Sequence, residues 1–304
     1  MLLADIRAFF LLAGVLEVDT PSCSRCGVTD PALESFKTRY TGPGAASGAD
    51  LYLHTSPEFP MKRLLAAGSG AIYQICKVFR DGEAGRYHNP EFTLLEWYRP
   101  GFDHHQLMDE MEQLIQGLLP SALPVRRISY GDLFRQHLDI DPFSATVEQL
   151  RNCAQQLQGV ESLNLTDTDS WLDLLLTHLI EPELGEGLCF VYDYPASQAS
   201  LARLSSDDPR IAERFELYIN GVEMANGFHE LTDENEQRQR FQLDQEKRQQ
   251  LDLPLVPMDE QLLHALGAGL PDCSGVALGI DRLLMHIVGA EHIDQVIAFP
   301  LDRA

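Results

Sequence analysis

Residues 214–230 read Arg-Phe-Glu-Leu-Tyr-Ile-Asn-Gly-Val-Glu-Met-Ala-Asn-Gly-Phe-His-Glu. Asn220 and Gly221 separate two strand-like runs, and Asn-Gly is the preferred two-residue turn of a β-hairpin. The stretch therefore predicts a hairpin of two antiparallel strands. With these residues in the turn, the expected facing pairs are Ile219–Val222, Tyr218–Glu223 and Glu216–Ala225.

Two carboxylates share one face of this hairpin. Because side chains alternate along a strand, Glu216 and Glu223 are expected to lie diagonally on that face, about 7 Å apart. Carboxylates this close repel each other unless one takes up a proton or a cation lies between them. Paired oxygen ligands suit a Mg²⁺ ion that phosphate also binds. We therefore expect a nucleotide-metal site, with a solvated strand face as the plainer alternative.

The composition limits the function classes. The chain has 304 residues, 44% hydrophobic and 23% charged, which is typical of a globular protein with an ample core. Its net charge of -23 lacks the positive surface that nucleic-acid binding needs, so nucleic acid is disfavoured as the main partner. No apolar run reaches the roughly 18 residues of a membrane span. We expect a cytoplasmic protein.

The six cysteines do not indicate a metal or disulfide framework. Cys23 and Cys26 have the spacing of half a zinc site or of a redox pair, but no second such pair follows. The thiols are therefore expected to be reduced, as in the cytosol.

The rest of the pattern predicts an α+β fold. Strands are expected at 15–21, 51–54, 71–80, 92–99 and 276–280, and helices at 3–13, 57–67, 104–119, 232–250 and 282–288, with Ser56 as the N-cap of the second helix. Residues 125–190 are expected to be a mainly helical inserted segment. Hairpins rather than βαβ units favour an antiparallel sheet flanked by helices.

Two further segments carry residues suited to binding phosphate. Arg80 ends a predicted strand, where its guanidinium fork suits two phosphate oxygens, and Phe92 on the return strand offers a platform for a base. Gly279 lets a ligand approach the backbone, and Arg282 follows in the first turn of a helix. Taken alone, each has a plainer interpretation, with Arg80 as a surface charge, Phe92 as a core residue and Arg282 as the partner of Asp281.

Together these side chains fit one class of reaction. Glu58, alone, is ordinary capping chemistry in the first turn of a helix. Two arginines, together with a Mg²⁺ ion held by the paired carboxylates, would offset phosphate charge, and surplus carboxylates would select an ammonium group. The combination indicates ATP activation of an amine-bearing acid.

Three ordered motifs then resemble those of class II lysyl-tRNA synthetases. Residues 78–98, Val-Phe-Arg-Asp-Gly-Glu-Ala-Gly-Arg-Tyr-His-Asn-Pro-Glu-Phe-Thr-Leu-Leu-Glu-Trp-Tyr, resemble motif 2. Gly-Ile-Asp-Arg at 279–282 resembles motif 3, and Gly-Val-Leu-Glu-Val-Asp-Thr-Pro at 14–21 resembles motif 1. Glu-Trp-Tyr-Arg-Pro at 96–100 and Ala-Asn-Gly-Phe-His-Glu-Leu-Thr-Asp at 225–233 are similar to the truncated paralogue family, the elongation factor P–(R)-β-lysine ligases.

The resemblance implies a fold and an activity. It implies one class II synthetase catalytic domain over residues 1–304, with an insertion at about 125–190 and no anticodon-binding domain. It implies a homodimeric ligase that activates (R)-β-lysine with ATP and Mg²⁺ and transfers it to a lysine ε-amine of elongation factor P. Neither a membrane nor tRNA is an expected partner.

The resemblance also implies roles for individual residues. Arg80 and Arg282 are the expected catalytic residues, with Arg80 on the α-phosphate and the substrate carboxylate and Arg282 on the γ-phosphate. Phe92 is expected to stack on adenine, and Glu216 and Glu223 to hold Mg²⁺. The expected ATP contacts are Arg80, Asp81, Gly82, Glu83, His88, Asn89, Phe92, Glu223, Met224, Gly279 and Arg282. The expected amino-acid pocket contains Ser56, Glu58, Glu96, Tyr98, Glu230 and Ala277.

Two positions depart from the lysyl-tRNA synthetase pattern. Gly82 stands where the family usually has a glutamate, and Glu83 is the candidate to replace it from the next position. Ala277 stands where lysyl-tRNA synthetases usually have glycine, which resembles the paralogue and reshapes the pocket by one methyl group. Two alternatives stay open at this point. One is a minimal synthetase that acylates tRNA, and the other is an inactive paralogue that binds adenylate.

Overall fold

The computed structural model describes residues 1–45, 47–160, 163 and 165–304, which form two compact units. The first contains Met1–Pro120 and Glu230–Ala304, and the second contains Ser121–His229. The second unit includes the expected insertion and continues through the whole hairpin of residues 211–229. That the two units form one catalytic domain remains a prediction.

The first unit contains a mainly antiparallel sheet in the order β1-β5-β6-β11. β1 and β5 are parallel neighbours. A smaller sheet has the order β2-β4-β3. The strands are β1 (Leu16–Glu17), β2 (Cys23–Ser24), β3 (Lys37–Tyr40), β4 (Ala49–Leu53), β5 (Ile72–Phe79), β6 (Glu91–Pro100) and β11 (Cys273–Gly279).

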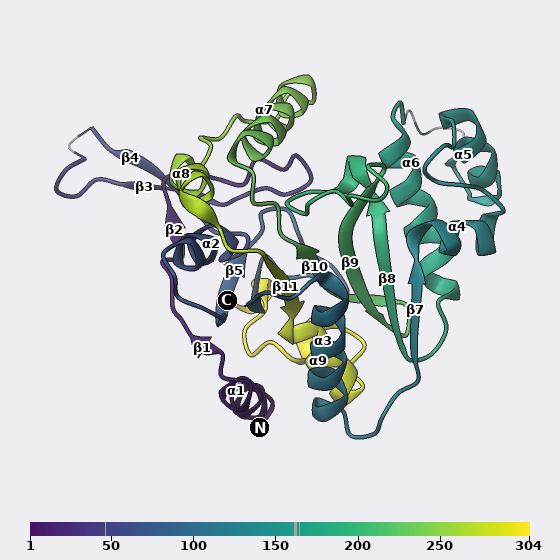
Figure 1. The fold of residues 1–304 in the computed structure, drawn as a ribbon, viewed down its shortest axis with the longest axis horizontal. Helices are drawn as coiled ribbons and strands as arrows, with labels where there is room; N and C mark the ends of the chain where they lie inside the picture. Colours follow the sequence, from purple (N-terminus) through teal and green to yellow (C-terminus); the bar gives the residue numbers. More distant parts are fainter. Residues whose placement is uncertain (46, 161–162, 164) are drawn as a thin grey trace. The chain divides into compact units, whose positions relative to one another are not determined.

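Helices pack on the strands and on one another in this unit. α3 contacts β11, α9 contacts β6, and α2 and α8 lie side by side (Figure 1). Asp103 begins α3 with a capping box, because its side chain accepts the Gln106 N–H and the Gln106 side chain accepts the Asp103 N–H. The helices are α1 (Leu2–Leu12), α2 (Glu58–Ala66), α3 (His104–Leu118), α7 (Glu234–Gln250), α8 (Glu260–Gly269) and α9 (Ile280–Val288).

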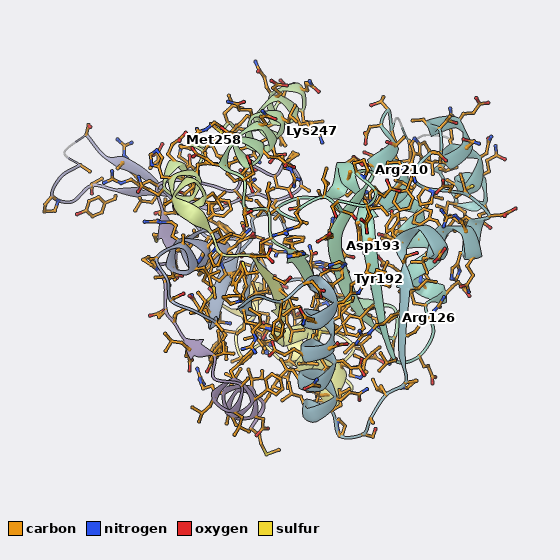
Figure 2. All side chains as sticks on the ribbon, viewed as in Figure 1. Arg126, Tyr192, Asp193, Arg210, Lys247 and Met258 are labelled. Carbon is orange, nitrogen blue, oxygen red and sulfur yellow. The ribbon has the colours of Figure 1, made fainter. Side chains whose placement is uncertain are left out.

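The second unit contains strands in the order β10-β9-β8-β7. β7 (Val125–Ser129) and β8 (Leu188–Pro195) are parallel neighbours, and Arg126 on β7 faces Cys189 on β8. Figure 2 labels Arg126 on the first of these strands and Tyr192 on the second. Parallel neighbours need a long crossover between them, and most of the helical residues of this unit lie in that crossover.

The other strands of the second unit are antiparallel, and its helices cover one side of them. β8 pairs with β9 (Ile211–Ile219), which pairs with β10 (Val222–His229). Figure 1 shows α4 (Tyr130–Leu138), α5 (Val147–Cys153) and α6 (Thr168–Leu175) gathered beside β7, β8 and β9. Their apolar side chains form one core with those strands, which includes Tyr130, Leu133, Trp171, Leu175 and Val191.

Most of the expected elements are present, and two details are corrected. The Asn220-Gly221 turn is confirmed, since both residues have a positive φ, 51° and 76°, as a type I′ turn requires. Glu216 faces Asn226 rather than Ala225, because a β-bulge between Glu223 and Ala225 adds one residue to β10. The N-cap of α2 is Pro57 rather than Ser56, although the Ser56 hydroxyl still accepts the Glu58 N–H at 3.0 Å.

Candidate active site

The floor of the candidate site is one face of β5, β6 and β11 in the first unit. Directly opposed residues on antiparallel strands project to the same face. Tyr98 faces Gly275, Glu96 faces Ala277 and Leu94 faces Gly279. The small residues of β11 therefore lie opposite larger side chains of β6.

An acidic pocket lies on this floor. Glu96 accepts hydrogen bonds from the Ser56 hydroxyl at 2.6 Å and from the Tyr98 hydroxyl at 2.6 Å. Glu230 reaches the same floor, because a Cβ placed on Gly275 would lie 2.6 Å from a Glu230 carboxylate oxygen and 2.3 Å from the Tyr98 ring. Glycine at 275 therefore permits this close approach.

A buried lysine completes the pocket. The Lys62 Nζ lies 2.6 Å from a Glu58 oxygen and 2.5 Å from a Glu230 oxygen. Lys62 is 1% exposed and Glu230 is also 1% exposed, so these charges are shielded from water. The structure thus brings together the whole set expected for the amino-acid pocket, which is Ser56, Glu58, Glu96, Tyr98, Glu230 and Ala277.

Burial disfavours the ionised forms of Glu96 and Glu230. Burial and then the nearby charge of Glu58 raise the pKa of Glu96 to about 7, against the hydrogen bonds from Ser56 and Tyr98. Burial also raises the pKa of Glu230 to about 8, with the Lys62 ammonium acting in the opposite direction. A bound ammonium group would favour the ionised forms of both acids.

Arg80 directly follows β5, and Phe92 lies near the start of β6, so the two residues meet at one end of this strand pair. The Arg80 guanidinium carbon lies 5.1 Å from the Phe92 ring centroid, and its Nη1 lies 3.5 Å from a Glu83 oxygen. Arg80 therefore covers one face of the ring, so adenine would need the other face or a movement of Arg80. Gly82 has a φ of 81°, which disfavours the glutamate that the family usually carries there.

Arg282 contacts the loop after β5. It donates to the Tyr87 carbonyl at 3.2 Å and contacts the His88 Nε2 at 2.7 Å. Asp281 accepts the Thr93 N–H at 2.6 Å. Burial, followed by the charge of Arg282, lowers the pKa of His88, which favours a neutral ring that accepts from the guanidinium.

The remaining expected ATP contacts differ in burial and in hydrogen bonding, and Met224 belongs to the second unit. The Asn89 side chain donates to the Glu91 carbonyl at 2.6 Å and accepts the Leu301 N–H at 3.2 Å, so it also holds the local backbone. Asp81 is exposed, and Gly279 is the N-cap of α9. Met224 is buried at the bulge of β10 in the second unit.

The two expected metal ligands share one face of the hairpin in the second unit. Tyr218 faces Glu223, and Glu216 lies two residues before Tyr218 on the same side of β9. Glu216 is held firmly by Arg214 at 2.5 Å, Tyr194 at 2.6 Å and Tyr218 at 2.5 Å. That these carboxylates lie in one site with Arg80 and Arg282 remains a prediction.

A third carboxylate lies beside them. Burial raises the pKa of Glu181 to about 7, and the charges of Glu216 and Glu223 add to the rise. A Cβ on Gly221 would lie 2.6 Å from the Glu181 carbonyl oxygen, so the turn packs closely against this residue. Hard oxygen donors of this kind suit Mg²⁺, and binding of one ion by these carboxylates remains a prediction.

The sequence interpretation missed Lys62 and Glu181. Lys62 follows Glu58 by four residues, which is the spacing of neighbours on one helix face, and this signal was present in the sequence. Glu181 belongs to a short 3-10 helix, Glu181–Glu183, and nothing local connects it to the hairpin.

Comparisons with known proteins identify the family of the chain. The family described as tRNA synthetases class II (D, K and N) matches residues 1–303. The chain therefore belongs to the class II tRNA synthetase family. Proteins named Elongation factor P--(R)-beta-lysine ligase from Salmonella dublin and Salmonella heidelberg are each 54% identical to it over 308 residues, covering 100% of this chain and 94% of each relative.

The expected α+β class is thereby confirmed, with a sheet flanked by helices. None of the helices in the described part of the chain has the length and apolar character that a membrane span requires.

Proposed function

We propose that this chain activates (R)-β-lysine with ATP and transfers the acyl group to a lysine ε-amine of elongation factor P. The observation that carries the proposal is the acidic pocket formed by Glu58 and the buried Glu96 and Glu230, in a chain similar over its full length to the named ligases. Carboxylates in such a pocket would bind the two ammonium groups of a diamino acid.

The first step is attack of the substrate carboxylate on the α-phosphorus of ATP. A bond forms between a carboxylate oxygen and that phosphorus, the bond to the bridging oxygen breaks, and pyrophosphate leaves. Arg80 would stabilise the charge that develops on the α-phosphate, and the pocket would hold the acid in position. Arg282 would bind the γ-phosphate.

Glu216 and Glu223 would hold Mg²⁺, with Glu181 near them. The ion, when bound, supplies positive charge that offsets the charge of the phosphates.

The second step is attack of a neutral ε-amine of the acceptor on the acyl carbon of the adenylate. An amide bond forms, the bond to the phosphate oxygen breaks, and AMP leaves while the amine gives up a proton. The net charge of -23 supports a protein acceptor rather than tRNA.

We further propose a cytoplasmic homodimer. Two apolar side chains at the end of α1 are exposed, Leu11 at 79% and Leu12 at 89%. Contact with a second copy of the chain would cover them.

Intact mass measurement of purified elongation factor P tests this function. With ATP, Mg²⁺ and (R)-β-lysine, we expect a mass increase of one lysyl group, and no increase when ATP is omitted. Acylation of total tRNA at a comparable turnover would contradict the choice of acceptor. Absence of pyrophosphate exchange with every lysine isomer would favour the inactive paralogue.

Replacing Ala277 by glycine is expected to raise the use of α-lysine relative to (R)-β-lysine by about 10-fold, because one methyl group is removed beside Glu96. The ratio of kcat/KM for the two isomers in pyrophosphate exchange measures this, since a loss of stability lowers both values alike. An unchanged ratio would remove Ala277 from the account of specificity.

A further inference from the structure

Lys62 is an unusual residue for the interior of a protein. It lies on the buried face of α2 beside Met61 and Leu65, and it is 1% exposed. Lysine is almost never fully buried unless it is paired. Its ammonium contacts two carboxylates, Glu58 on the same helix at 2.6 Å and Glu230, which is distant in sequence, at 2.5 Å.

Both partners of Lys62 belong to the proposed amino-acid pocket. Glu230 contacts Lys62 through one oxygen, and its other oxygen lies near the position that a Cβ on Gly275 would take. Lys62 therefore holds one oxygen of Glu230, while the other oxygen lies at the floor of the pocket beside Gly275.

The charges of the pocket match a diamino acid only when Lys62 is counted. With Glu58, Glu96 and Glu230 ionised, three negative charges and the one positive charge of Lys62 leave two negative charges. A diamino acid carries two ammonium groups at neutral pH. Two further titratable side chains lie near this group: Tyr98, whose hydroxyl donates to Glu96, and Cys76, whose pKa is raised by burial and then by the charge of Glu96.

We propose that Lys62 is a positioning residue that holds Glu58 and Glu230 in place for the ammonium groups of a diamino acid. The proposal rests on the proposed function, because it concerns the same amino-acid pocket. Lys62 acts through the two carboxylates and forms no bond with the reacting atoms.

Burial acts to lower the pKa of Lys62, but the charges of Glu230 and Glu58 outweigh this effect. The pKa is raised overall, and the amine stays protonated. In return, Lys62 opposes the rise in the pKa of Glu230. Removal of Lys62 would therefore raise the pKa of Glu230 further, and substrate binding would need a higher pH.

The test compares the full chain with Lys62→Met and with Arg63→Met, which changes an exposed basic residue on the same helix. Pyrophosphate exchange is measured against (R)-β-lysine and against ATP from neutral to alkaline pH. For Lys62→Met we expect the KM for (R)-β-lysine to rise about 30-fold or more with the KM for ATP unchanged. We also expect the rise of kcat/KM with pH to move upward by about one unit or more.

A lower activity with an unmoved pH profile would overturn the proposal, since a purely structural role predicts that result. If Lys62→Met does not fold, Lys62→Met/Glu230→Gln is compared with Glu230→Gln, because the double change removes one charge of each sign from the interior. Nearly equal KM values in these two variants would support action through Glu230, and additive effects would contradict it. Failure of the unmodified chain to show exchange would count against the proposed function instead.

Discussion

Replacing Glu223 by glutamine is expected to lower the rate of adenylate formation by about 10²–10³-fold without unfolding the protein. The amide keeps the size of the side chain but loses the charge that would bind Mg²⁺. Glu223 is half-buried on β10, so the fold does not depend on its charge. Pyrophosphate exchange at saturating Mg²⁺ measures the loss, and thermal unfolding checks the fold.

Glu186→Gln is the matched control, because Glu186 is an exposed carboxylate of the same unit. We expect its exchange rate to equal that of the unmodified chain. An unchanged rate in Glu223→Gln would show that this carboxylate is not a metal ligand in the reaction.

Replacing Arg80 by glutamine is expected to lower kcat for pyrophosphate exchange by about 10³-fold, because its guanidinium would stabilise the α-phosphate in the transition state. The contacts of Arg80 with Phe92 and Glu83 are partly exposed, so their loss costs little stability. Single-turnover measurement of AMP formation separates this effect from weaker ATP binding.

Arg25→Gln serves as the control, since Arg25 is an exposed arginine of the same unit. A change confined to the KM for ATP would assign Arg80 to binding alone. Retention of the full rate would exclude it from catalysis.

The hairpin shows how far local sequence patterns reach. The Asn220-Gly221 turn is predictable because few residue pairs accept a positive φ at both positions. The bulge near Met224 is not, because an extra residue in one strand leaves no clear mark in the alternation of side chains. Glu216 and Glu223 nevertheless share a face, since Tyr218 lies opposite Glu223 and two residues after Glu216.

The candidate site shows a similar division. Its family motifs identify Glu58, Glu96 and Glu230, and the structure brings these residues into one pocket. The spacing of Glu58 and Lys62 indicates a pair on one helix face, but the burial of Lys62 depends on packing and on the contact with Glu230, which is distant in sequence. Glu181 was missed because its approach to the hairpin depends on tertiary packing against Gly221.

The central idea is selection of a diamino acid by buried negative charge, and a matched pair of substrates tests it most directly. Pyrophosphate exchange is measured with (R)-β-lysine and with the analogue in which a hydrogen atom replaces the terminal amino group. The analogue would leave a buried carboxylate unpaired, so we predict a kcat/KM at least about 10³-fold lower than that of (R)-β-lysine. Equal values for the two compounds would contradict the account.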